Sequence, residues 1–451
     1  MTTAPAGWQV DRRFYWSLAL MFAIGVAFTL LPGGLDFSTV EDVDPNSDFG
    51  EVGSGSLARK LQWLPLFMFA GVVFLYRAQL ALNMARHINI FLVLFVLWCF
   101  VTTLWSPYPG TTFRKCVQLF GVLMIALSFQ LASWTPRRYQ DVLRPTIHWI
   151  VLLSVPFAIL FPELGIHSGG DTDGKWSGLT TNKNTLGLAA AFSTILWLHG
   201  WASAEVRTRS AVFGVLLALV VQLLAQSGTA FAVTAVGGAI VIMVLRPPVD
   251  YRGRLLSWLL SLALLIGIPY YIWSMAFGAP TMTDVLTPVA ALFGKDVTLT
   301  GRSDIWLMVL EFAADHPVQG VGYGAFWLGP DSMIAPIVDK LYWVPRQAHN
   351  GYIDVLNETG LIGLTLVVGY LVVYAIQLAR VAGVDRSAFA LHSAVFAYLI
   401  MTNIAETVMF RTITLCFFVT TVSSLCLSRI LFEAELRQQA QRLQFGQARP
   451  A

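Results

Sequence analysis

Charge is scarce in this sequence. Only 12% of its 451 residues are charged, whereas soluble domains carry about 25%. The chain also has no Walker loop, no Gly-rich dinucleotide fingerprint and no HExxH motif, which are the patterns of the commonest nucleotide and zinc sites. The first absence excludes an ordinary soluble domain. The others remove the most familiar nucleotide-dependent and zinc-dependent chemistries.

Paired cysteines and basic clusters are missing as well. The four cysteines lie within or beside apolar runs without the spacing of a metal site, which favours inert core cysteines; they are Cys99, Cys116, Cys416 and Cys426. The net charge of +3 comes with no basic stripe, so nucleic acid is not an expected partner. The chemistry must therefore come from other polar residues.

What the sequence has in abundance is hydrophobic residues, at 56%. A helix crosses a bilayer with roughly 17 to 25 residues, and apolar runs of about that length recur along the whole chain. They predict a single all-α polytopic membrane domain over residues 1–451 with about twelve transmembrane helices, at 14–31, 61–76, 88–104, 115–132, 146–161, 185–202, 211–226, 229–245, 255–273, 360–379, 388–404 and 411–431.

The basic residues predict an orientation. If the N-terminus is cytoplasmic, the inner segments hold most of the 29 Lys and Arg residues but only a minority of the 26 Asp and Glu residues. Because Lys and Arg are retained in the cytoplasm, both termini are expected there, including a charged tail at 433–451. The first span, behind Arg12 and Arg13, is predicted to be a retained anchor and no signal peptide. Membrane lipid is thus a constant partner.

Three outward segments are long enough to contribute a site: 32–60, 162–184 and 274–359. The first is acidic and rich in Gly and Ser, which favours a mobile loop. The second contains "SGLTTNKNTLG", where Lys183 and Asn184 begin a span. A positive helix end would help Lys183 to attract anions, although a lysine that merely reaches the membrane interface explains the same pattern equally well.

The large outward loop 274–359, between predicted helices 9 and 10, is the most informative, because loops of this length are usually functional. Residues 302–315 predict an amphipathic helix that stops at His316 and Pro317, and His316 is interpreted as a neighbour of that stop. Arg302 stands at the start of this helix. Its guanidinium could grip an anion, or it could form a local pair with Asp304.

The stretch "RQAHNGYIDVLNETGLIGL" leads from this loop into the tenth span. His349 and Asn350 stand at the outward end of a helix, where the positive terminus disfavours protonation of an imidazole. A neutral histidine can act as a general base, although a hydrogen-bonded loop histidine is the alternative. Gly360 and Gly363 are three residues apart, which predicts close packing of a neighbouring helix on that face.

Several pieces together resemble a known family. His349-Asn350, nine residues, Gly360, two residues and Gly363 resemble the signature of the bacterial O-antigen ligase and Wzy-type polymerase superfamily. "GRSDIW", "HPVQGVGYGAFW" and "SGLTTNKNTLG" are similar to segments of its exopolysaccharide-polymerase branch. The resemblance covers the topology of residues 90–430 and is most specific in 175–190 and 300–365; the order and spacing of the pieces carry it.

The resemblance implies a GT-C-like membrane glycosyltransferase in the bacterial inner membrane with its active site on the periplasmic side. Such enzymes transfer an undecaprenyl-diphosphate-linked glycan to a sugar hydroxyl, with inversion and without a nucleotide sugar, and this chain could also contact other polysaccharide-assembly proteins.

The expected roles of the residues follow that chemistry. His349 is the expected base, and cationic side chains are expected to hold the diphosphate: Arg302, Lys183 and Arg346. Asn184, Asn350 and Tyr352 are expected to orient sugars or the histidine. No cofactor or metal is expected, although Asp171 and Asp173 are an alternative Mg²⁺ pair.

One departure from the pattern affects the choice between the two activities. Ligases of this superfamily carry a second arginine near the middle of the chain, where this sequence reads "AQSGTAF" with Gly228 at the corresponding place. This favours a polymerase, with an O-antigen ligase that uses lipid A-core as the acceptor as the alternative.

A transporter or flippase and a structural scaffold are the remaining alternatives. The predicted spans carry no acidic or basic side chain away from their ends, whereas coupled transporters usually place such residues inside. A scaffold would not need His349 and Arg302.

Overall fold

The fold was analysed in a computed structural model, which describes residues 12–32, 35, 57–132, 138–168, 172–246, 302–341, 344–411 and 413–447. The described residues are almost entirely helical, with one isolated β-bridge between Ile166 and Trp176. The protein is an all-α polytopic membrane protein, as the sequence predicts. The predicted ninth span, 255–273, and much of the predicted loops 32–60 and 274–359 lie outside the described residues.

The described residues up to 246 form ten α-helices. Helices α4 and α5 are joined through one 3-10 turn, Ala85–His87, and a sharp bend, so together they are a candidate for one broken span. The ten helices are α1 (Arg12–Leu30), α3 (Leu57–Tyr76), α4 (Ala78–Met84), α5 (Ile90–Val101), α6 (Pro109–Ala132), α7 (Arg138–Leu160), α8 (Pro162–Gly165), α9 (Lys183–Ala202), α10 (Thr208–Ala225) and α11 (Gly228–Leu245).

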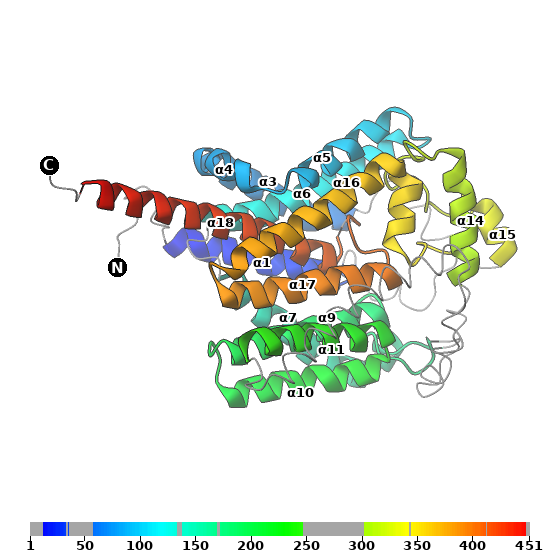
Figure 1. Cartoon of the computed structure of the whole chain (residues 1–451). Helices are drawn as coiled ribbons and strands as arrows, with labels where there is room; N and C mark the ends of the chain where they lie inside the picture. The colour runs from blue at the N-terminus through cyan, green and yellow to red at the C-terminus, as the bar shows by residue number, and fades with distance from the viewer. Residues whose placement is uncertain are drawn as a thin grey trace, which may run out of the picture.

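The second half of the chain adds five helices. Two of them, α14 and α15, lie at the end of the bundle opposite the protruding end of α18 (Figure 1). The five are α14 (Arg302–Asp315), α15 (Ala335–Leu341), α16 (Gly351–Ala382), α17 (Arg386–Ala405) and α18 (Leu415–Gln447). The predicted helix 302–315 is therefore confirmed over its described length, with its end at Asp315.

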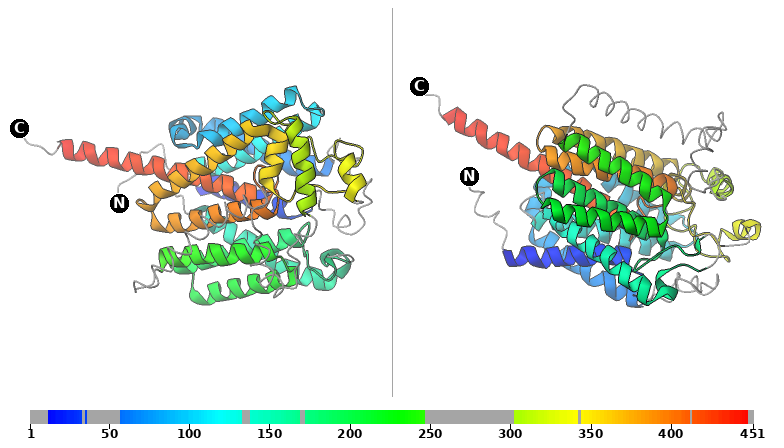
Figure 2. Two further views of the ribbon diagram at one scale, coloured as in Figure 1. Left: turned by 45° about the vertical axis from the view of Figure 1, so that its right-hand side comes forward. Right: turned by 90° about the horizontal axis from the view of Figure 1, so that it is seen from below.

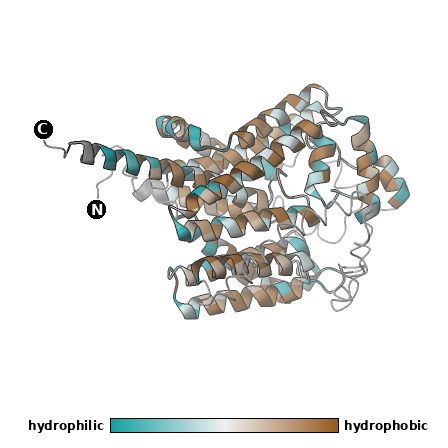
Figure 3. Ribbon diagram, viewed as in Figure 1, coloured by the Kyte–Doolittle hydropathy of each residue, from teal (hydrophilic) through white to brown (hydrophobic). Residues whose placement is uncertain are grey.

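The long helices run side by side as a bundle (Figures 1 and 2). Among the described residues nine helices are long and apolar enough to cross a membrane, the broken pair α4 and α5 makes a tenth candidate, and α1 has a shorter apolar stretch, Trp16–Leu30. Apolar residues follow the helices along their length, whereas the protruding end of α18 is hydrophilic (Figure 3). The predicted tail at 433–451 thus begins as a direct continuation of α18.

Burial divides the bundle into an inner and an outer set of helices. In the apolar 18-residue stretch of α18, 94% of the residues are buried, and in that of α9 78% are buried, whereas in that of α3 only 22% are buried. Helix α9 packs against α10 and α11, α11 packs against α17, and α6 packs against α3 and α18. Helix α3 therefore has one face toward the bundle and a broad apolar face toward lipid.

The helices bring buried, paired charges into the bundle. Arg144 is buried in α7 and pairs with Glu205, with 3.0 Å between the guanidinium nitrogen and the carboxylate oxygen. Arg429 is buried in α18 and pairs with Glu433 at 2.7 Å. Arg144 lies outside the predicted span 146–161 and Arg429 lies near the end of the predicted span 411–431. The helices α7 and α18 extend beyond the apolar runs and carry these charges there, each with a partner.

Gly360 of α16 has a different role from the predicted helix packing. Gly360 has φ +67° and ψ −171°, so the helix bends there. A Cβ atom at Gly360 would lie 2.2 Å from the carbonyl oxygen of Val318, and one at Gly363 would meet the side chain of Thr359. The prediction of a helix-packing face is therefore wrong at Gly360, where the glycine admits the backbone of the preceding loop.

Backbone hydrogen bonds tie the bend to that loop. Val321 N donates to Asn357 O and Gly322 N donates to Glu358 O, while Leu361 N and Ile362 N donate to the carbonyls of Pro317 and Val318. The carbonyls freed by the bend thus regain partners. This junction separates a short first segment of α16, Gly351–Thr359, from the long span that follows.

We expect Gly360→Ala to lower the melting temperature of the detergent-solubilised protein, with a loss of roughly 2 to 4 kcal/mol, because alanine is strained at positive φ and its methyl group meets backbone. Gly71→Ala is the matched control, since a Cβ atom at Gly71 in α3 meets nothing within 4 Å. Equal melting temperatures for the two variants would contradict the proposed role of the bend.

Candidate active site

The segment before α16 is held from both sides. Asn350 caps α16, because its side-chain oxygen accepts hydrogen bonds from the backbone nitrogens of Tyr352 and Ile353 at 3.0 and 3.4 Å. Ala348 O accepts a hydrogen bond from Trp306 Nε1 at 2.7 Å, and Ala348 N donates to Asp354 Oδ2 at 3.1 Å. His349 lies between these two anchored residues with φ +53°.

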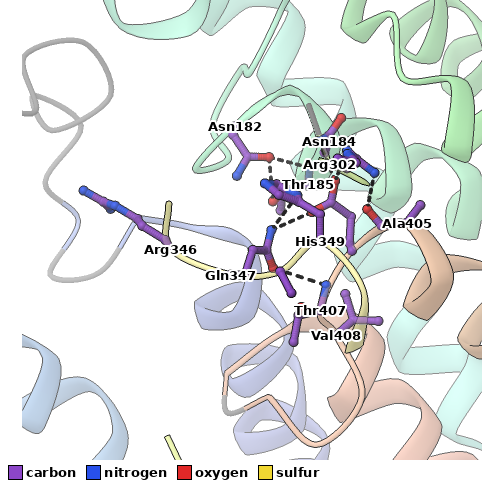
Figure 4. Close-up of polar contacts among 12 residues, drawn as sticks. Asn182, Asn184, Thr185, Arg302, Arg346, Gln347, His349, Ala405, Thr407 and Val408 are labelled. Atoms are coloured by element: carbon purple, nitrogen blue, oxygen red, sulfur yellow. Dashed lines mark hydrogen bonds and ion pairs between the residues drawn. The ribbon is translucent and has the colours of Figure 1, made fainter. Parts of the chain in front are cut away.

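The side chains of the site converge on a buried carboxylate, Glu406. It directly follows α17 and is 7% exposed. Its Oε1 accepts from Asn184 Nδ2 at 2.9 Å and from Arg302 Nη2 at 3.3 Å, while its Oε2 lies 2.6 Å from Gln347 Nε2 and 3.0 Å from His349 Nδ1. The contacts come from α9, α14 and the segment before α16 (Figure 4).

Further hydrogen bonds fix the geometry around Glu406. Arg302 Nη1 donates to the carbonyl oxygen of Ala405 at 2.6 Å, and Gln347 Oε1 accepts from the backbone nitrogen of Thr407 at 3.2 Å. The side chains of Arg302 and Gln347 each hydrogen-bond to a backbone group and to the carboxylate of Glu406. Arg302 and Gln347 are therefore each held at two points.

The cluster determines the charge state of Glu406. Burial raises the pKa of this carboxyl, but its contacts outweigh that effect and lower the pKa: the hydrogen bond and electrostatic interaction with His349, the positive charge of Arg302 and the hydrogen bond from Gln347. The net pKa of Glu406 is below its ordinary value. The carboxylate is therefore charged at neutral pH and can hold a proton on His349 Nδ1, which leaves Nε2 as the basic nitrogen.

The predicted site residues are partly brought together. His349, Arg302 and Asn184 meet at Glu406. Lys183 begins α9 beside Asn184, and its backbone nitrogen donates to His167 Nε2 at 3.2 Å.

Three predicted residues lie differently. The side chain of Arg346 points away from the cluster (Figure 4), and its carbonyl oxygen accepts from Arg411 Nη2 at 2.8 Å. Asn350 is engaged as the cap of α16, and Tyr352 is half-buried in the first turn of that helix.

Position 228 lies at the site end of the bundle. Gly228 begins α11, and its neighbour Ser227 lies against α9, since a Cβ atom at Gly187 would meet Ser227 Cβ at 2.7 Å. The start of α11 is thus packed beside the first turns of α9, the helix that begins at Lys183. Residues 183 and 228 therefore lie at the same end of the bundle.

A cavity of about 510 Å³ lies next to the cluster. Asn184, Gln347 and Glu406 contribute one part of its lining. A second set of polar residues lines it from α3 and α6 and from the segment before α18; it comprises Arg59, Gln62, Thr111, Arg114, Lys115, Gln118 and Arg411. Aromatic and aliphatic side chains from α1 and α3 complete one flank, including Phe28, Leu31 and Trp63.

The sequence did not reveal Glu406, Gln347 or the cationic lining from α3 and α6. Glu406 stands at the outer edge of an apolar span, and a carboxylate at such an edge opposite a histidine loop is the one signal that could have indicated it. Of the alternative Mg²⁺ pair, Asp171 lies outside the described residues and Asp173 is exposed. Within the described ranges no group of three or more His, Cys, Asp or Glu residues could hold a metal ion.

Comparisons with known proteins point to one family. The family described as O-Antigen ligase matches residues 213–368, a range that includes α14, His349 and the first part of α16. The chain is also 29% identical over 362 residues to the exopolysaccharide production protein ExoQ of Rhizobium meliloti (strain 1021), which covers 75% of this chain and 74% of that protein.

The charge state of Glu406 makes a prediction about stability. A carboxyl with a lowered pKa in the folded protein contributes stability that is present above its unfolded pKa, near 4.5, and lost as the pH falls through the folded pKa. We expect Glu406→Gln to lower the melting temperature at pH 7, and this deficit should shrink as the pH falls below 4.5. Glu311→Gln, at an exposed position of α14, is the control. A deficit that is constant across this pH range would refute the assignment.

Proposed function

Because the chain belongs to the O-antigen ligase and Wzy-like family of membrane polysaccharide-assembly proteins, we propose that it polymerises undecaprenyl-diphosphate-linked oligosaccharide repeat units. The observation that carries the proposal is the contact between His349 and the buried carboxylate Glu406, beside a polar cavity at one end of an apolar bundle. This arrangement supplies a base at the edge of the membrane, where a lipid-linked sugar can reach it.

The proposed reaction is an inverting glycosyl transfer. A hydroxyl oxygen of the acceptor sugar attacks the anomeric carbon of the donor, and the bond between that carbon and the diphosphate oxygen breaks. His349 Nε2 takes the proton of the attacking hydroxyl, while Glu406 holds Nδ1 and stabilises the imidazolium that forms. Undecaprenyl diphosphate leaves with the electron pair of the broken bond.

Arg302 has two roles in this proposal. Its guanidinium holds Glu406 and the end of α17, so it positions the carboxylate that orients the base. Its positive charge and that of Lys183 also favour the diphosphate on the side of α9 and α14. Asn184, which donates to Glu406, orients the same network. Arg346 is assigned to the rim, where a longer glycan would pass, whereas Tyr352 packs against the core of the bundle.

The orientation in the membrane follows the basic residues. Helix α1 begins and α18 ends at one end of the bundle, and α14 and α15 lie at the other (Figure 1). In the proposed topology both termini are cytoplasmic and the site faces the periplasm of the inner membrane. A lipid-linked repeat unit then reaches the cavity from the outer leaflet.

An O-antigen ligase is the second candidate, because the matched family carries that description. A ligase and a polymerase share the donor and differ in the acceptor, which is lipid A-core for the ligase and another lipid-linked repeat unit for the polymerase. Polymerase is favoured by Gly228, which stands where ligases carry a second arginine. The similarity to an exopolysaccharide production protein supports the same choice.

The proposed activity can be tested with purified protein in proteoliposomes and an undecaprenyl-diphosphate-linked repeat unit. A ladder of longer glycans, resolved by gel electrophoresis, is the expected product, and it should persist in a chelator because cationic side chains supply the positive charge. Product that forms only after lipid A-core is added would identify a ligase. Release of free glycan with neither product would overturn both assignments.

In the same assay, His349→Ala should reduce the rate of chain extension by a factor on the order of 10² to 10⁴, the usual contribution of general-base catalysis. His316→Ala is the matched control, since His316 is an exposed residue after α14. Size-exclusion profiles and melting temperatures should match for both variants. A folded His349→Ala protein with wild-type turnover would remove the histidine from the mechanism.

A further inference from the structure

Asp354 is a buried carboxylate beside the site, and the proposed reaction gives it no role. It stands in the first turn of α16, lines the cavity and is 3% exposed. The positive end of a helix favours a negative charge in its first turn, but a buried carboxylate is costly unless donors satisfy it. Its hydrogen bonds therefore show what this carboxylate holds in place.

Three protein groups donate to Asp354. Trp327 Nε1 donates to Oδ1 at 2.8 Å, and Ala348 N donates to Oδ2 at 3.1 Å. Thr407 Oγ1 also donates to Oδ2. A carboxylate oxygen has two lone pairs, so these two donors occupy both lone pairs of Oδ2. The carboxylate is thus engaged with the protein, which disfavours a role as a second base.

The two donors at Oδ2 come from the residues next to the proposed base and its carboxylate. Ala348 directly precedes His349, and Thr407 directly follows Glu406. One oxygen atom of Asp354 therefore joins the segment before α16 to the segment after α17. The direct contact of 3.0 Å between His349 Nδ1 and Glu406 Oε2 joins the two side chains, whereas the bridge at Oδ2 joins their two backbones.

The backbone that follows Thr407 has an anchor of its own. Asn403 Oδ1, on the last turn of α17, accepts from the backbone nitrogens of Val408 and Met409 at 3.2 and 2.9 Å. Asn403 therefore fixes the later part of this segment to α17. The bridge to Asp354 fixes its beginning to α16, the helix that His349 precedes.

We infer that Asp354 is a positioning residue for the proposed reaction, because its bridge fixes the backbone separation of His349 and Glu406. The inference rests on the proposed function, since it names a residue that serves the same base. A general base must lie within about 2.6 to 3.2 Å of the hydroxyl whose proton it takes. A residue that fixes the backbone of the base should therefore affect the rate of the chemical step more than the binding of the substrate.

Asp354→Asn tests the bridge in the chain-extension assay. An amide has one acceptor oxygen and an NH2 group, so it cannot accept from both Trp327 and Ala348. We expect kcat to fall about tenfold, the loss expected for one buried hydrogen bond, while KM for the lipid-linked repeat unit changes by less than about twofold. Asp339→Asn, at an exposed position of α15, is the control and should turn over as the wild type does.

Two results of this comparison would overturn the inference. One is a folded Asp354→Asn protein with the kcat of the wild type. The other is a raised KM with unchanged kcat, which would make Asp354 a substrate-binding residue.

Thr407 offers a second pair of variants for the same bridge. Thr407→Val keeps the shape of the side chain and the backbone contact with Gln347 but removes the hydroxyl, whereas Thr407→Ser keeps the hydroxyl. We expect kcat to fall severalfold in Thr407→Val and to recover most of that loss in Thr407→Ser. Equal kcat values for the two variants would contradict the bridge, also in the case that Asp354→Asn does not fold.

A measurement without turnover separates the positioning role from the proposed function. Contacts that share a hydrogen-bond network are coupled, so their effects on stability do not add. The loss of melting temperature that Glu406→Gln causes at pH 7 should therefore be smaller in the Asp354→Asn background than in the wild type. It should be unchanged in the Asp339→Asn background. Thr407→Val replaces Asp354→Asn in this comparison if the latter does not fold.

The two proposals fail on different results. Wild-type turnover in His349→Ala would remove the proposed base but would leave the coupling between Asp354 and Glu406 standing. Additive losses of melting temperature, in an enzyme whose turnover depends on His349, would overturn the positioning role alone.

Discussion

The buried carboxylate of Glu406 is the interaction on which the site depends. An ionised carboxylate costs several kcal/mol to bury unless donors satisfy it, and here four side chains do so: Asn184, Arg302, Gln347 and His349. They come from α9, α14 and the segment before α16. The need to satisfy one charge therefore ties together segments separated by more than two hundred residues. The same need fixes the imidazole, because the only nitrogen of His349 that meets the carboxylate is Nδ1.

The bend in α16 is a second constraint, and it supports the first. At Gly360 the loop that follows α14 approaches the helix backbone, and the two exchange hydrogen bonds on both sides of the bend. Helix α14, which carries Arg302, is thereby attached to the helix that His349 precedes. In the glycine-rich turn at 320–324, the carbonyl oxygen of Gly324 accepts a hydrogen bond from Lys115, and its backbone nitrogen donates one to Glu358. The long loop thus has fixed points at both the Glu406 cluster and the cationic lining.

The sequence predicted the parts that depend on local pattern. Eleven of the twelve predicted spans overlap described helices, of which nine are long and apolar enough to cross a membrane, or ten with the bent pair α4 and α5. The helix stop at His316-Pro317 located the end of α14. The role of Glu406 could not be predicted from the sequence. Its contacts are with residues 184, 302, 347 and 349, and contacts between residues this far apart produce no periodic pattern in the sequence. Gly360 was misread for a related reason: a glycine that admits a loop backbone and a glycine that admits a helix look identical in sequence. Arg346 was grouped with His349 by proximity, yet residues of an extended segment point in different directions.

The backbone of His349 shows why the imidazole direction is so strongly determined. A positive φ of +53° is unfavourable for histidine by roughly 1 kcal/mol or more, so the conformation persists only where its surroundings impose it. Both polar backbone atoms of Ala348 are hydrogen-bonded to other segments, and Asn350 is fixed as a helix cap. With its neighbours held, His349 has one backbone conformation, and Glu406 then selects one ring orientation. Both the backbone conformation and the contact with Glu406 fix the position of His349, so the imidazole needs little reorganisation when a sugar hydroxyl binds. A preorganised site of this kind stabilises the transition state without a reorganisation cost during the reaction.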